Sequence, residues 1–151
     1  MIQRIQSVYL LLIVIFYSFM LFLPIATFGN YTYSVWSIKD STGLAGIPTY
    51  YLGLLAVIII GIAISTIFLY KNRPLQSKLG VAIFVLILVF LSLMFFVYPE
   101  FVISKLGGSE MQINYTIYSF FGVLPLAFVL LANKAIQKDE KLVKSADRLR
   151  G

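Results

Sequence analysis

The chain alternates between four long apolar segments and short polar connections. No charged residue occurs in Ile5–Phe28, Thr49–Tyr70, Leu79–Tyr98 or Ile113–Asn133. A helix needs about 20 residues to cross a hydrocarbon core about 30 Å thick, and each segment is that long. A surface helix of a soluble protein keeps a polar face, which these segments lack. The pattern predicts an all-α membrane protein, a four-transmembrane-helix bundle with one helix in each segment and residues 1–133 as one domain.

The composition supports this interpretation because charged residues are scarce. Hydrophobic residues make up 60% of the chain and charged residues 12%, and the mean hydropathy is +0.94. Soluble domains carry about 25% charged residues, so this chain has too few to cover a water-facing surface. The net charge of +6 lies mainly at the ends of the apolar segments, where anionic lipid headgroups attract it. The lipid bilayer is therefore an expected partner, and nucleic acid is not favoured.

The distribution of Lys and Arg predicts how the chain is oriented. Ten of the 12 basic residues lie in the N-terminus, in the connection after the second segment and in the tail, and the others are Lys39 and Lys105. Basic residues in short connections mark the cytoplasmic side of a membrane. Residues on the basic side are therefore expected in the cytoplasm, namely 1–4, 71–78 and 134–151. The remaining connections, 29–48 and 99–112, are expected outside.

The two outer connections carry a strand-like pattern. Tyr31–Ile38 alternates polar residues with aromatic or β-branched ones, and Met111–Tyr115 follows a Gly-Gly turn. Alternation with a period of two is typical of strands. We expect the two segments to pair into a small β element on the outer face, and a solvated irregular loop is the alternative.

The tail, residues 134–151, is the most informative polar segment. It has no Gly or Pro before Gly151, and its apolar residues recur near helical spacing, which predicts a charged amphipathic helix. One interpretation is a helix lying on lipid through its basic face. The acidic residues within the tail favour docking onto a protein, because a lipid anchor gains nothing from them. The candidate partner or lipid contacts are Lys134, Lys138, Lys141, Leu142, Val143, Lys144, Arg148 and Arg150.

Small residues define a candidate packing face on the second helix. Gly53, Gly61 and Ser65 share this face, and Gly61-x-x-x-Ser65 has the spacing that lets another backbone approach closely. Packing within the chain is the first interpretation. Contact with a membrane-protein partner or with a second copy of the chain is the alternative.

The sequence contains no pattern typical of catalysis or of metal binding. It has neither His nor Cys, the residues that supply most metal ligands, many general bases and all thiolates. Hydroxyls inside the apolar segments, such as Ser65 and Thr66, are expected to bond neighbouring helices or their own i−4 carbonyls. We therefore expect no enzyme activity, no cofactor and no metal site.

Two motifs at the ends of the chain resemble a known family. The opening MIQRIQSVYLLL (residues 1–12) and the closing KDEKLVKSADRLR (residues 138–150) are similar to the ends of an uncharacterised Bacteroidota family of small four-pass inner-membrane proteins. The resemblance implies a bacterial inner-membrane location and a four-helix fold, and it brings no activity. Our functional interpretation is a non-enzymatic accessory or scaffold subunit of a membrane complex. The alternative is a small transporter or channel formed by oligomerisation.

Overall fold

A computed structural model describes residues 2–40, 45–69, 72–106 and 112–150. Most of these residues are helical, and a small five-stranded sheet joins the helices at one end. The helical elements are α1 (Ile2–Met20), α2 (Tyr50–Phe68), α3 (Arg73–Ser92), the π turn η1 (Leu93–Val97), α4 (Tyr98–Leu106), the 3-10 turn η2 (Ile117–Ser119) and α5 (Phe120–Arg150). The strands are β1 (Ala26–Phe28), β2 (Tyr31–Tyr33), β3 (Ser37–Asp40), β4 (Ala45–Pro48) and β5 (Ile113–Tyr115).

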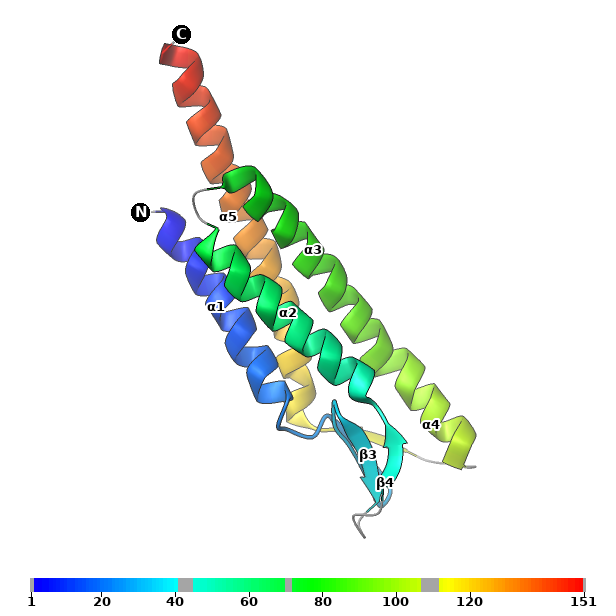
Figure 1. Cartoon of the computed structure of the whole chain (residues 1–151). Coiled ribbons are helices and arrows are strands. Elements are labelled where there is room, and N and C mark those ends of the chain that lie inside the picture. The colour runs from blue at the N-terminus through cyan, green and yellow to red at the C-terminus, as the bar shows by residue number, and fades with distance from the viewer. Residues whose placement is uncertain (1, 41–44, 70–71, 107–111, 151) are drawn as a thin grey trace.

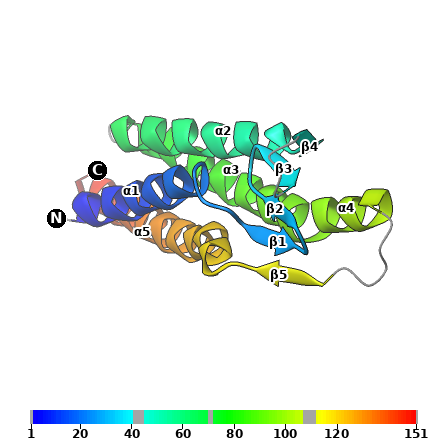
Figure 2. The ribbon, with the colours of Figure 1, turned by 90° about the horizontal axis from the view of Figure 1, so that it is seen from below.

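The long helices pack side by side, and the sheet lies beyond one end of them. Helix α1 contacts α2 and α5, and α3 contacts the same two helices from the other side. The start of α1 and the end of α5 lie at the end opposite the sheet (Figure 1). Figure 2, seen from below, shows β1 and β2 crossing beneath the helices, with β5 continuing out from the start of α5.

Among the described residues, three helical stretches are long and apolar enough to cross a membrane: Tyr50–Phe68, Pro74–Lys105 and Ile117–Val143. The apolar part of α1, Ile5–Met20, is shorter. The apolar segments predicted from the sequence therefore correspond to helices, but their ends differ. The third helix is longer than 79–98 because η1 and α4 continue α3 without a break.

The first and fourth predicted helices are wrong at their sheet ends. The segment 5–28 ends as strand β1, and the segment 113–133 begins as strand β5 followed by η2. Pro24 lacks a backbone N–H and disfavours a helical conformation at the residue before it, so α1 gives way to turns after Met20. The absence of charged residues identifies apolar segments, but it does not distinguish a helix from a buried apolar strand.

The sheet has the order β4-β3-β2-β1-β5, and all neighbouring strands are antiparallel. Ala26 pairs with both Tyr33 and Tyr115, so β1 lies between β2 and β5. Gly29 forms the β1–β2 turn with a φ of 53°, a conformation that favours glycine. The predicted small β element is present, but the predicted pairing of Tyr31–Ile38 with Met111–Tyr115 is wrong. Strand β1, which we predicted to be part of a helix, lies between these two segments. Met111 lies outside the described residues.

The space between the helices is filled by apolar side chains. Its fully buried members include Leu10, Ile13, Tyr17, Ile59, Ala63, Ile83, Ile87, Phe90 and Val129. The outward faces are apolar too, with exposed residues such as Leu11, Leu54, Val85, Leu88 and Leu130. Helices that are hydrophobic around their whole circumference need an apolar environment outside as well as inside.

Candidate functional site

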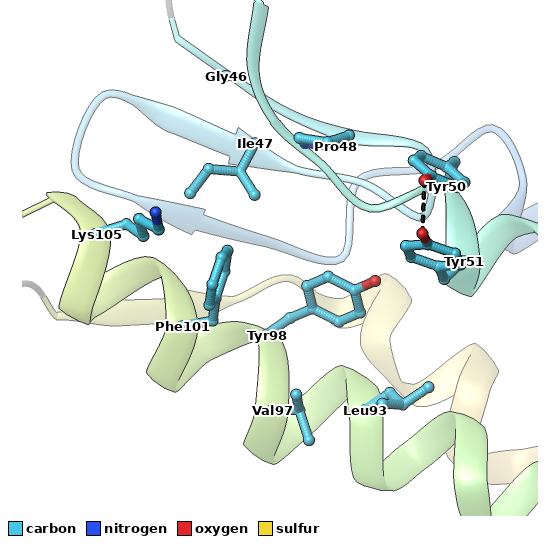
Figure 3. Close-up of a pocket in the computed structure, with 10 residues that line it drawn as sticks. All are labelled: Gly46, Ile47, Pro48, Tyr50, Tyr51, Leu93, Val97, Tyr98, Phe101 and Lys105. Atoms are coloured by element: carbon cyan, nitrogen blue, oxygen red, sulfur yellow. Dashed lines mark hydrogen bonds between the residues drawn. The ribbon is translucent and has the colours of Figure 1, made fainter.

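A cavity lies where the sheet meets the long α3–η1–α4 helix. It has a volume of about 820 Å³ and opens between β4 and the start of α2 on one side and η1 and α4 on the other. Figure 3 shows Ile47 of β4 and Phe101 of α4 pointing toward one another across it. We call this cavity the interface pocket, and its lining residues are Gly46, Ile47, Pro48, Tyr50, Tyr51, Leu93, Val97, Tyr98, Phe101 and Lys105.

The helical wall of the interface pocket changes from apolar to charged along its length. Leu93, Val97, Phe101 and Lys105 follow one another at intervals of four residues, so they share one helix face. The first two are aliphatic, and the last carries the charge. The Lys105 ammonium lies 5.7 Å from the centroid of the Phe101 ring, within the range of a cation–π contact.

Tyrosine hydroxyls form the polar part of the opposite wall. Tyr50 and Tyr51 are joined by a hydrogen bond of 2.7 Å between their hydroxyls, and their ring centroids are 4.1 Å apart (Figure 3). Only one of the two hydroxyl protons is used in that bond. The other remains available to an acceptor in the pocket.

The π turn η1 sets the orientation of the helical wall. A π turn contains one extra residue, so the helix face beyond it is rotated relative to α3. Two tyrosines from the sheet reach its carbonyls: the Tyr33 hydroxyl lies 3.5 Å from the Met94 oxygen, and the Tyr115 hydroxyl lies 3.5 Å from the Phe95 oxygen. Burial raises the pKa of the Tyr33 phenol far above its ordinary value, so the phenol stays protonated and can donate this hydrogen bond. A second cavity, of about 450 Å³, lies beside Phe95 and Tyr115.

The sheet is fixed to three helices by side-chain hydrogen bonds. The Trp36 indole donates to the Leu21 carbonyl at 2.9 Å, just after α1. Thr49, which precedes α2, donates to the Ser34 carbonyl at 2.8 Å. Ser119, before α5, donates to the Ile25 carbonyl at 2.8 Å. These bonds attach the sheet, and with it the β4 wall of the interface pocket, to the helices.

The predicted tail residues lie on an uninterrupted continuation of α5. This helix runs from Phe120 to Arg150, so the tail is helical as predicted. Its last turns extend beyond the other helices (Figure 1). Of the predicted contact residues in the tail, Lys134, Lys138, Lys141, Leu142 and Val143 have exposed side chains. The side chains of Lys144, Arg148 and Arg150 lie outside those that the structure describes.

The predicted packing face divides into two parts. Gly53 is buried against Trp36, and a Cβ added to it would lie 2.5 Å from a ring carbon. Gly61 and Ser65 are exposed, and a Cβ at Gly61 would meet nothing within 4 Å. Gly53 therefore packs within the chain, whereas Gly61 and Ser65 face outward. Contact of these two residues with another chain stays a prediction.

Hydroxyls within the helices bond to backbone carbonyls, as the sequence predicted. Ser65 donates to the Gly61 carbonyl at 2.8 Å and Thr66 to the Ile62 carbonyl at 2.7 Å, both four residues back. Among the described residues, no three acidic, His or Cys side chains are grouped to hold a metal ion.

Sequence reasoning missed the interface pocket, although part of its signal was visible. The spacing of Leu93, Val97, Phe101 and Lys105 indicates one helix face, but our predicted helix ended at Tyr98. The chain matches no curated protein and no solved structure. A family model described as Domain of unknown function (DUF4293) matches residues 2–149, and the chain therefore belongs to that family of uncharacterised proteins.

Proposed function

We propose that the chain is a four-span protein of the bacterial inner membrane that serves as a non-enzymatic accessory or scaffold subunit. In this proposal it binds a partner protein through the exposed end of α5. The observation that carries the proposal is the length of α5. Its 31 residues extend about 46 Å at 1.5 Å per residue, well beyond a hydrocarbon core about 30 Å thick. About three turns then remain outside the bilayer.

The arrangement of the chain ends supports four spans. In the part of the chain that the structure describes, three helical stretches are long enough to cross a membrane, and α1 packs between two of them. The start of α1 and the end of α5 lie at the same end of the molecule (Figure 1), which requires an even number of crossings. The apolar part of α1 would extend about 24 Å. A bilayer accommodates such a short span by local thinning.

The packed interior favours an accessory role over transport by a single copy. The space between the helices is filled by apolar residues such as Ile59, Ile87 and Phe90, and the hydroxyls of Ser65 and Thr66 bond to carbonyls of their own helix. The alternative, an oligomeric transporter or channel, would need copies to meet through an outward face. The exposed Gly61 and Ser65 are the candidate residues for that contact.

Reporter fusions test the proposed topology. Alkaline phosphatase is active only outside the cytoplasm, so a fusion after Lys78 should be inactive and a fusion after Lys105 should be active. The expected difference follows from the concentration of basic residues on one side. The fusion after Lys78 keeps α1 and α2 complete before the junction, and the fusion after Lys105 also keeps α3 and η1 complete. Phosphatase activity of the fusion at Lys78 would reverse the orientation.

Truncation of α5 tests the docking role. The packed part of α5 continues past Asn133, because Ile136 is only 2% exposed. The deletion should therefore begin after Glu140, which removes Lys141, Leu142 and Val143 but leaves the packed turns intact. We expect the truncated protein to insert normally and to lose its partner in co-purification from native membranes. Each apolar side chain removed contributes at most about 1.5–3 kcal/mol when fully buried, so several must act together.

The variant Ser145→Ala is the matched control for this deletion. The Ser145 hydroxyl donates to the Leu142 carbonyl of the same helix at 2.8 Å, so its removal leaves the tail in place. This variant should recover the same partner as the wild type. If the truncated protein inserts, folds and still recovers that partner in the same amount, the docking proposal is wrong. Recovery of a homo-oligomer without another protein would favour the transporter or channel.

A further inference from the structure

We propose that the interface pocket binds a lipid with an anionic headgroup. The acyl chain would lie against Leu93 and Val97, and the headgroup would lie beside Lys105. This inference rests on the proposed membrane embedding, which sets the sheet and α4 at the outer lipid–water boundary. It assigns to the pocket a ligand that is separate from any partner of the tail.

The depth of the pocket matches the change from lipid to water. From Leu93 to Lys105 the helix advances about 18 Å at 1.5 Å per residue, from the helix core toward the sheet end. The aliphatic lining, which also includes Ile47, offers no polar side-chain group. Its volume of about 820 Å³ lies within the range of about 300–1,000 Å³ typical of small-molecule sites. A hydrocarbon chain can fill the aliphatic end of the pocket, whereas a soluble anion would leave that end empty.

The charge of the pocket selects the headgroup. Lys105 is the charged side chain among the described lining residues, and it is exposed at the water-facing end. A phosphate oxygen accepts a hydrogen bond from the Lys105 ammonium, and its negative charge complements that ammonium. The Tyr50–Tyr51 pair lies toward the other end of the pocket (Figure 3), so it is not part of this headgroup contact. The tyrosines that line the pocket suit the lipid–water boundary, because the tyrosine ring is apolar and its tip is polar.

The pocket is continuous with the lipid-facing surface of the helices. Val97 lines the pocket and is half exposed, and its neighbour Phe96 is 72% exposed on the outside of the same turn. A lipid would therefore enter from the side, without opening the packed interior. A helix of another protein is the competing occupant, and the experiment below distinguishes it.

Native mass spectrometry of the full-length protein in mild detergent tests the headgroup. Phosphatidylglycerol should remain bound more strongly than phosphatidylcholine of the same chain length. The variant Lys105→Gln should lower this preference about fivefold, the factor expected for one basic residue near an anionic headgroup. The control is Lys39→Gln, because Lys39 is the other basic residue of the outer connections and lies on β3 outside the pocket. It should keep the preference of the wild type.

A pair of valine variants tests the acyl chain. Val97→Trp places a large ring in the pocket, whereas Val85→Trp places the same ring on the outer face of α3 at almost equal exposure, 49% against 51%. We expect Val97→Trp to lower phosphatidylglycerol binding at least tenfold and Val85→Trp to leave it unchanged. Circular dichroism of both variants checks that each remains folded.

Three results would overturn the lipid site. These are equal retention of the two lipids by the wild type, equal effects of the two lysine variants, and competition by free glycerol phosphate as strong as by the lipid. Loss of a protein partner on Val97→Trp with unchanged lipid binding would assign the pocket to a helix instead. Carbonate extraction tests the proposed membrane embedding by itself, because an integral membrane protein remains in the membrane fraction. A protein that resists extraction but shows no lipid preference disproves only the lipid site.

Discussion

Replacing Phe90 by Ala should lower the free energy of unfolding by about 3–5 kcal/mol, the range for a large aromatic removed from a packed core. Phe90 is fully buried between the helices, and its ring meets that of Tyr17 edge-on at 5.1 Å between centroids. Inside a bilayer the burial of apolar surface does not by itself hold helices together, because lipid is equally apolar. The loss comes from the cavity and the missing contacts. Thermal or denaturant unfolding in mild detergent measures it.

Phe96→Ala is the matched control, because the same residue type lies six positions away on the outside. Its side chain is 72% exposed, so lipid or detergent replaces most of what the truncation removes. We expect a change within about 0.5 kcal/mol, as for other exposed positions. A loss at Phe96 as large as the loss at Phe90 would mean that another chain covers this face. A small loss at both positions would contradict the packed interior that argues against transport by one copy.

Hydropathy predicted the helices well and the strands poorly, for a physical reason. The segment that became α2 has no charged residue and is bounded in the sequence by Pro48 and Lys71, so its predicted ends, 49–70, nearly coincide with Tyr50–Phe68. The same hydropathy criterion gave the wrong end for α1, because Ala26 and Phe28 are as apolar as helix residues yet are buried in a strand. The pairing of β1 with β5 joins residues almost 90 positions apart. Local periodicity carries no information about such a partner.

The interface pocket depends on contacts that no local pattern specifies. Its helical wall is visible in the sequence as the spacing of Leu93, Val97, Phe101 and Lys105. Its other wall, formed by Ile47 and its neighbours in β4, faces the helix only because the sheet lies beside η1 and α4. The π turn that orients the helical wall has no sequence signature of its own. The helical conformation of the tail, in contrast, could be predicted from the sequence, because helical spacing is a local property. Helix α5 extends through the tail.

Replacing glycine by alanine should change stability in opposite directions at two positions of α2. Alanine has fewer conformations than glycine in the unfolded chain, so at a compatible site the replacement stabilises by about 0.4–1 kcal/mol. Gly61 is such a site, because a Cβ there would meet nothing within 4 Å. At Gly53 the Cβ would lie 2.5 Å from a ring carbon of Trp36, and the indole is held by its 2.9 Å bond to the Leu21 carbonyl. Forcing an extra methyl into a packed contact costs about 1–3 kcal/mol.

The two glycine variants also separate packing within the chain from packing between copies. Unfolding measured in detergent should show Gly53→Ala destabilised and Gly61→Ala unchanged or stabilised, with both monomeric. If Gly61 lies in an interface between two copies, the methyl group added by Gly61→Ala would hold the two backbones apart, because small residues are what allow close approach there. Gly61→Ala would then lower stability and shift the oligomer toward monomer, whereas Gly53→Ala would act on the monomer alone. Because the same chemical change is made in the same helix, a difference in sign cannot come from helix propensity and must come from what each glycine faces.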